Sequence, residues 1–146
     1  MAAMVRLLTE GADLRSAADQ SLAMLRSHAR HEETEEAMRA AITLAGQPCA
    51  DQVAAVETLG GGWVGEEALA IGLYAALSAR SFVEAIRIAA NHSGDSDSTA
   101  SIAGQLWGAM NGLDGMPHAW VSALDVLLPL LHLARRLFGD LSVPSC

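Results

Sequence analysis

One stretch of the sequence, from Glu66 to about residue 77, predicts a helix that is apolar on nearly every side. Such a helix must be surrounded by other elements, because no face of it suits water. Three adjacent glycines, Gly60 to Gly62, precede it and predict a loop, since a regular helix does not tolerate such a run. The chain should therefore pack several helices around a central one. The apolar residues that recur at helical spacing are Ala68, Leu69, Ile71, Leu73, Ala76 and Leu77.

Five other segments carry helix signals, and no segment alternates polar and apolar residues as a strand would. Asp13 is placed to cap the first helix, and Pro129 is able to kink the last. We predict an all-α, orthogonal helical domain of about six helices in a single region, 1–146, with a frayed tail at 139–146. The predicted helices are 16–25, 31–45, 66–77, 81–90, 98–111 and 120–138.

The charged residues exclude several classes of function. Seventeen acidic residues outnumber nine arginines, the net charge is −8, and no basic stripe is present to bind a nucleic acid. The chain contains no lysine, which excludes Schiff-base chemistry, a Walker-type phosphate loop and a lysine general base. No run of about 18 apolar residues predicts a membrane span. Cys49 and Cys146 are too few for a disulfide framework, so we expect reduced thiols in a cytoplasmic protein.

The polar run 94–99, Gly-Asp-Ser-Asp-Ser-Thr, predicts half of a divalent-metal site. Asp95 and Asp97 are two residues apart among hydroxyl side chains, so a turn here can direct several oxygen ligands at one point. Magnesium, calcium and manganese prefer such ligands. The N-terminus of the following helix opposes a cation, and the two carboxylates must outweigh it. The alternative is an ordinary turn, in which Gly94 ends one helix and Asp97 or Ser98 caps the next.

Two known acidic motifs do not fit this run. An EF-hand would need Gly and Glu where this chain has Ala100 and Leu106. The spacing Asp-x-Asp-x-Thr also resembles the nucleophile motif of haloacid-dehalogenase-like phosphotransferases, which follows a hydrophobic strand and needs a downstream lysine. Here the preceding residues predict a helix, and lysine is absent.

A longer pattern resembles a third family. The segment 91–99, followed by Ile-Ala-Gly at 102–104 and by Gly108, resembles the C-terminal metal motif of ADP-ribosylglycohydrolases. The segment 59–68, Leu-Gly-Gly-Gly-Trp-Val-Gly-Glu-Glu-Ala, resembles the glycine loop and buried helix that precede this motif in the family. The resemblance is good over roughly residues 50–140 and loose over the first 50.

The resemblance implies an all-α hydrolase that uses two magnesium ions to cleave the glycosidic bond between ADP-ribose and a protein side chain or small acceptor. By residue-by-residue carry-over it implies that Asp95, Asp97 and Ser98 are metal ligands, with Asp97 as the candidate bridge between the ions. Two cations can orient the ribose hydroxyls and a water without a lysine or cysteine nucleophile. The implied partners are an ADP-ribosylated protein or a small ADP-ribosyl compound.

The family's other acidic motif has no counterpart in this chain. Members carry an N-terminal Gly-Asp motif and a Thr/Ser-Asp-Asp group that supply the remaining ligands. The early acidic residues here lie on or beside predicted amphipathic helices instead. The chain therefore resembles the C-terminal half of such a domain, and two carboxylates alone should hold magnesium only weakly. It is then a truncated or split product, one part of a complex with a complementary chain or second copy, or a non-catalytic helical interaction module.

Three features beside the acidic run are candidate substrate contacts, and no catalytic residue can be assigned. Trp63 could stack on an adenine or ribose face, or pack in the core. The backbone amides of Gly60, Gly61 and Gly62 could contact a diphosphate, or the run could be a flexible connector. His92 could position substrate or a water, or be a hydrogen-bonded residue at a helix end.

Overall fold

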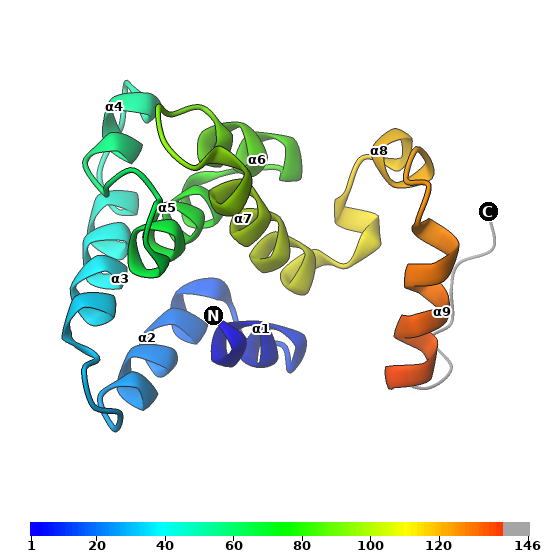
Figure 1. The fold of residues 1–146 in the computed structure, drawn as a ribbon, viewed down its shortest axis with the longest axis horizontal. Helices are drawn as coiled ribbons and strands as arrows, with labels where there is room; N and C mark the ends of the chain where they lie inside the picture. Colours follow the sequence, from blue (N-terminus) through cyan, green and yellow to red (C-terminus); the bar gives the residue numbers. More distant parts are fainter. Residues whose placement is uncertain (139–146) are drawn as a thin grey trace.

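The computed structural model describes residues 1–138, and every regular element in that range is helical (Figure 1). This confirms the predicted all-α class, although the described residues form nine α-helices and one 3-10 helix where about six helices were expected. The predicted fraying of 139–146, and Cys146, lie outside the described residues. The elements are α1 (Ala2–Thr9), α2 (Leu14–Leu25), α3 (Glu32–Ala45), α4 (Gln52–Glu57), α5 (Gly65–Ser78), α6 (Phe82–Ala90), α7 (Ser96–Asn111), η1 (Leu113–Gly115), α8 (His118–Ser122) and α9 (Leu127–Phe138).

Helix α5 is the centre of the fold, as its apolar pattern predicts. All residues from Ala68 to Ala76 are buried. Helices α3, α6 and α7 pack around α5, and α1 packs on α2 and α7 (Figure 1). The crossing of α5 and α7 is close, because a Cβ atom on Gly72 would overlap the side chain of Ile102. The small residues of both helices therefore allow the two backbones to approach.

Two helices that were not predicted from the sequence complete the packed body. Helix α1 buries Met4 and Leu8, which are four residues apart and so lie on one face. Helix α4 is a short segment capped by Asp51, whose carboxylate accepts hydrogen bonds from the Val53 and Ala54 amides. Asp13 caps α2 as predicted, by accepting a hydrogen bond from the Ser16 amide at 3.0 Å.

The predicted helix 120–138 is two helices. Helix α8 ends at Ser122, and α9 begins at Leu127 with Pro129 as its third residue. Proline is tolerated there because the first amides of a helix have no intrahelical acceptor. The two helices form an arm that stands beside the packed body, drawn in yellow to orange in Figure 1. Phe82 meets Trp120 edge to face, with ring centroids 5.9 Å apart, and so links α6 to the arm.

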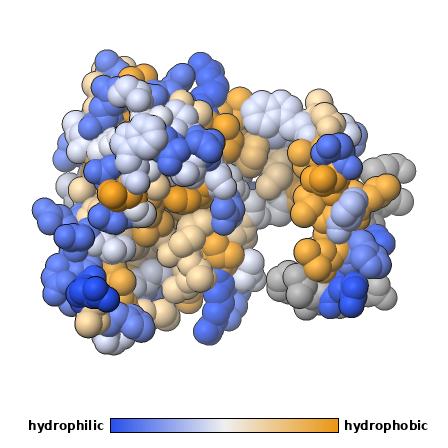
Figure 2. Space-filling model, in the orientation of Figure 1, coloured by the Kyte–Doolittle hydropathy of each residue, from blue (hydrophilic) through white to orange (hydrophobic). Residues whose placement is uncertain are grey.

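The arm carries much of the exposed apolar surface of the described residues. Figure 2 shows apolar side chains gathered over it. No helix within residues 1–138 is long and apolar enough to span a membrane. The large apolar side chains exposed in the arm are those of Trp120, Leu124, Val126, Leu128, Leu130 and Leu133.

Candidate metal and substrate site

The acidic run forms the turn that joins α6 to α7. Helix α6 ends at Ala90 with Asn91 as its C-cap, and α7 begins at Ser96 with Asp95 in the N-cap position. The structure confirms the predicted end of the helix at Ala90, whereas the alternative's helix end at Gly94 and the cap at Asp97 or Ser98 are wrong. The helix starts earlier because the Asp95 carbonyl already accepts a hydrogen bond from the Thr99 amide at 3.2 Å. Asp97 and Ser98 consequently lie in the first turn, where their side chains are free of the capping role.

The three predicted metal ligands are neighbours. The pKa of the Asp95 carboxyl is lowered, chiefly by hydrogen bonding with the Asp97 side chain and then with that of Ser98. The Asp95 side chain makes no capping hydrogen bond of ordinary geometry, although the Ser98 amide lies near enough to help lower this pKa. Asp97 is exposed and the other two are partly exposed. Two carboxylates and a hydroxyl thus share one patch of accessible surface.

The glycine loop before α5 lies directly against this turn. The Asp95 amide donates a hydrogen bond to the Gly61 carbonyl at 2.8 Å. A Cβ atom on Gly94 would overlap that same carbonyl group, so the approach of the two backbones requires glycine at position 94. The structure therefore brings together two segments that the sequence analysis treated separately. Segment 60–63 was predicted to contact substrate, and segment 92–98 contains the predicted metal ligands and His92.

Glu67 fixes the glycine loop, a role that the sequence pattern did not predict. Its carboxylate oxygen Oε2 accepts hydrogen bonds from the Gly61 amide at 3.1 Å and from the Gly62 amide at 3.0 Å. The loop is therefore a held structure and not a flexible connector. A diphosphate could reach these two amides only by displacing Glu67. The signal in the sequence was a carboxylate in the first turn of a helix directly after a glycine run, where side chains often reach back to free amides.

His92 and Thr99 form a hydrogen-bonded chain beneath the turn. The His92 atom Nδ1 accepts a hydrogen bond from the Gly94 amide at 3.1 Å, so the neutral ring carries its proton on Nε2. Nε2 lies 3.0 Å from the hydroxyl of Thr99, which is fully buried and donates to the Ala89 carbonyl at 2.7 Å. Both ring nitrogens therefore have partners inside the loop. A direct contact of His92 with substrate remains a prediction.

Trp63 does not pack in the core, because 73% of its surface is exposed. An edge of its indole lies against Gly61, where a Cβ atom would clash with the ring. The ring is thus placed next to the loop that holds Asp95 and remains accessible. Its stacking on a nucleoside remains a prediction.

The acidic turn suits magnesium in ligand type and falls short in ligand number. Carboxylate and hydroxyl oxygens are the donors that magnesium prefers, and the ion usually keeps several waters. Within residues 1–138, no three His, Cys, Asp or Glu side chains converge in a way that could hold a metal ion. The residues present therefore fit one part of a metal site.

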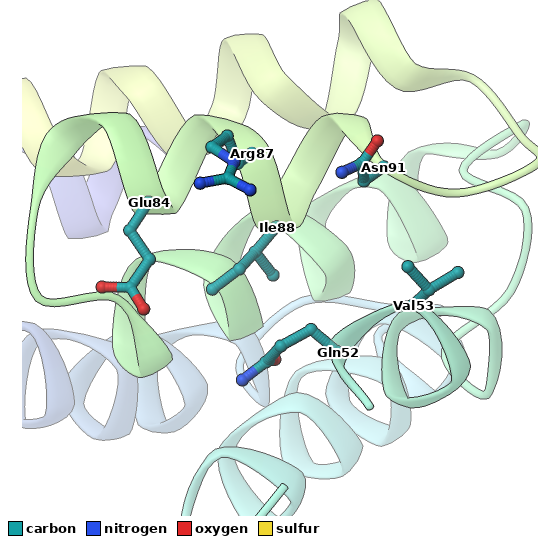
Figure 3. A pocket seen from close by; sticks show the side chains of 6 residues that line it. All are labelled: Gln52, Val53, Glu84, Arg87, Ile88 and Asn91. Atoms are coloured by element: carbon teal, nitrogen blue, oxygen red, sulfur yellow. The ribbon is translucent and has the colours of Figure 1, made fainter. Parts of the chain in front are cut away.

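Two hollows on the described surface contain no predicted site residue. One, of about 210 Å³, lies between α4 and α6 and is lined by Gln52, Val53, Glu84, Arg87, Ile88 and Asn91 (Figure 3). The other, of about 480 Å³, is a more open depression over α3, lined by Glu32, Glu35, Glu36, Arg39 and Ala40. The candidate site is therefore described by its polar contacts.

The resemblance to ADP-ribosylglycohydrolases predicted an all-helical body with an acidic motif and a glycine loop, and the structure places these two segments in contact. A family model described as ADP-ribosylglycohydrolase matches residues 1–145, so the chain belongs to this family. The match includes the first 50 residues, where the resemblance of motifs was loose.

Part of the chain is also similar to one protein with a named activity. The chain is 40% identical over 72 residues to a protein of Pseudomonas putida (strain GB-1) named ADP-ribosylarginine hydrolase Tri1. The matched stretch covers 49% of this chain and 19% of the relative. No solved structure matches the chain.

Proposed function

We propose that this chain supplies Asp95, Asp97 and Ser98 to a magnesium site that hydrolyses ADP-ribosyl glycosidic bonds. The observation that carries the proposal is the position of these three side chains at the start of one helix, where all three are at least partly exposed. None of the three makes a regular capping hydrogen bond at the start of α7. Asp97 and Ser98 lie beyond the N-cap position, so capping does not account for their side chains.

The rest of the turn supports ligand binding by holding its shape. Backbone and partly buried side-chain hydrogen bonds fix the Gly94–Asp95 segment on both sides, through Gly61 and through the His92–Thr99 pair. Ligands that are held in advance bind a metal more tightly than mobile ones. Magnesium bound here would orient and polarise a glycosidic substrate. Trp63 is exposed beside Gly61, the residue that contacts the turn, so its ring is available to a nucleoside.

We also propose that the isolated chain is incomplete as a catalyst. Two carboxylates and a hydroxyl leave a magnesium site short of protein ligands, and a pair of ions would need more. The missing ligands would come from a complementary chain or from a second copy of this one. A cytoplasmic location is part of the proposal, and the described cysteine, Cys49, is a free thiol.

The substrate that we would test first is an ADP-ribosylated arginine side chain, because the relative is named for that linkage. The match between the two proteins contains only part of each chain, so the linkage is a proposal about substrate class. Free ADP-ribose is a useful probe of binding, since it carries the ribose and diphosphate of any ADP-ribosyl compound.

The test is calorimetric titration of magnesium into the purified chain, with and without ADP-ribose. We expect weak, saturable binding that Asp97→Asn lowers severalfold or more, with helix content unchanged by circular dichroism. Asp19→Asn is the matched control, because it removes the same charge from an exposed position on α2. Equal magnesium affinity in the wild type and Asp97→Asn would overturn the ligand assignment.

A second candidate function is a non-catalytic helical interaction module or truncated remnant. The exposed apolar side chains of the arm favour this alternative, because surfaces of this kind commonly mark sites of association. The same titration separates the two candidates. No magnesium binding at millimolar concentration, with or without ADP-ribose, would leave the interaction role as the better account.

A further inference from the structure

We infer that Glu67 is a positioning residue, which holds Asp95 in place through the backbone of the glycine loop. The inference rests on the proposed function, because it assigns Glu67 to the same site. The inference is based on two successive hydrogen-bonding contacts. The Glu67 carboxylate binds the Gly61 and Gly62 amides, and the Gly61 carbonyl binds the Asp95 amide.

The first contact is strong for its type. One carboxylate oxygen accepts two hydrogen bonds from adjacent amides, at 3.1 and 3.0 Å. Hydrogen bonds to a charged group are about twice as strong as those between neutral groups. The carboxylate also lies where two free amides would otherwise need another partner, since Gly62 is buried. Removing the carboxylate should therefore free this part of the loop to move.

The second contact transmits the position of the loop to the acidic turn. Gly61 is bonded on both of its polar atoms, with its amide on Glu67 and its carbonyl on the Asp95 amide. The fit around Gly61 is tight, because Gly94 lies against the same carbonyl group. A shift of Gly61 therefore moves Asp95 or breaks its backbone hydrogen bond.

The backbone of the loop is shaped around the Glu67 side chain. Gly60 has φ of +112° and Gly62 has φ of +75°, conformations that other residues rarely adopt. A Cβ atom on Gly60 would clash with the Glu67 side chain, so the carboxylate passes directly beside this glycine. The glycines thus give the loop room to wrap around one acidic side chain.

A simple helix-stabilising role does not account for these contacts. Carboxylates near a helix N-terminus are favourable in general, and Glu66 and Glu67 both lie in the first turn of α5. Only Glu67 has hydrogen bonds to the loop among the described contacts of these two residues. Glu66 therefore provides a matched control, which shares the charge and the helix position of Glu67 but not its contacts.

The test is amide hydrogen exchange, measured by nuclear magnetic resonance in the full chain without metal. We expect Glu67→Ala to raise the exchange rates of Gly61 and Gly62, and to raise that of Asp95 roughly tenfold or more. Glu67→Gln keeps one carbonyl acceptor, so its exchange rates should fall between those of the wild type and Glu67→Ala. Glu66→Ala should leave all three amides near their wild-type rates.

Two results would overturn the inference. One is an Asp95 exchange rate in Glu67→Ala equal to that in Glu66→Ala. The other is an equal increase across all helices, which would mean that Glu67 only stabilises the whole fold. Comparison with the amides of α3 separates local from global effects.

Magnesium titration then connects the inference to the proposed function. Where the wild type binds magnesium, Glu67→Ala should weaken binding severalfold, Glu67→Gln should weaken it less, and Glu66→Ala should leave it unchanged. Where the wild type binds no magnesium, the proposed metal role fails, and the exchange rates still decide whether Glu67 positions Asp95.

Discussion

Helices α5 and α9 are both rich in apolar residues, yet α5 is buried in the fold and α9 is largely exposed. In α5 every residue from Ala68 to Ala76 is buried. In α9 the side chains of Leu128, Leu130 and Leu133 are exposed, although the helix is as leucine-rich as any in the chain. The contrast shows that an apolar pattern predicts a helix that is stabilised by burial, but it does not predict which other element will pack against that helix.

The reason for the difference lies in the neighbours of each helix. Gly72 in α5 lets α7 come close, and α3 and α6 cover the other sides. The arm follows the turn at Gly112 and meets the body through the ring contact of Phe82 and Trp120. Among the described residues, no element packs against the exposed leucines of α9 as closely as α3 and α7 pack against α5.

The largest expected effect is the loss of stability when a large side chain of α5 is truncated. Ile71 is completely buried, so Ile71→Ala should lower the free energy of unfolding by about 2–5 kcal/mol. Leu128 is 77% exposed in α9, and Leu128→Ala should change that free energy by no more than about 0.5 kcal/mol. Urea denaturation of the two variants measures the contrast. Similar losses in both would mean that α9 is covered in solution.

A second prediction concerns association through the arm. We expect the chain to elute from a size-exclusion column earlier at high concentration than at low, because the arm exposes several large apolar side chains. The double variant Leu128→Gln, Leu133→Gln should reduce this shift. A chain that stays monomeric at every concentration would contradict the prediction.

The control for association uses exposed apolar residues of the body. Met24 and Val53 are both about half exposed, on α2 and α4. The double variant Met24→Gln, Val53→Gln also removes exposed apolar side chains, although less exposed ones, and should leave the elution shift unchanged. An equal effect of both double variants would point to general stickiness and not to the arm.

The fold could be predicted from the sequence where the residues of a single helix are sufficient to identify it. The pattern of α5 and the cap at Asp13 were visible locally, because apolar spacing and capping depend on nearby residues. Helices α1 and α4 were missed because they are short and become helical by packing Met4, Leu8 and Val56 into the core. The break between α8 and α9 was missed because proline was taken as a kink where it belongs to a first turn.

The residues of the candidate site could be proposed from the sequence, but the contacts between them could not. Asp95, Asp97 and Ser98 follow from the motif, and the structure brings them together with the glycine loop. The roles of Glu67 and Thr99 were not predictable, because each depends on a contact between elements. No local pattern shows that the Thr99 hydroxyl reaches the Ala89 carbonyl ten residues earlier.

The smallest expected effect is on stability, and it tests whether surface ion pairs stabilise the fold as much as buried apolar side chains do. Glu35 on α3 binds two arginines, with Arg26 Nη2 at 2.6 Å and Arg39 Nε at 2.9 Å. Hydrogen bonds first from Arg26 and then from Arg39 lower its pKa from 4.5 to about 2. The Glu35 side chain is only 16% exposed, but both arginines are at least half exposed, so water and salt screen the pairs and they contribute little. Asp125 in the arm, with no ion pair among the described contacts, is the matched comparison.

The sign of the pH dependence follows from that shift. Between about pH 4.5 and about pH 2 the folded chain keeps Glu35 ionised while the unfolded chain protonates it, so the contribution is complete above pH 4.5 and is lost as the pH falls. Glu35→Gln should therefore lower Tm by a few degrees at most at neutral pH, with the gap closing towards pH 2. Asp125→Asn should show no such closing gap. Thermal melts across this range measure both variants, and a constant difference between Glu35→Gln and the wild type would mean that the Glu35 side chain acts by packing and not by its charge.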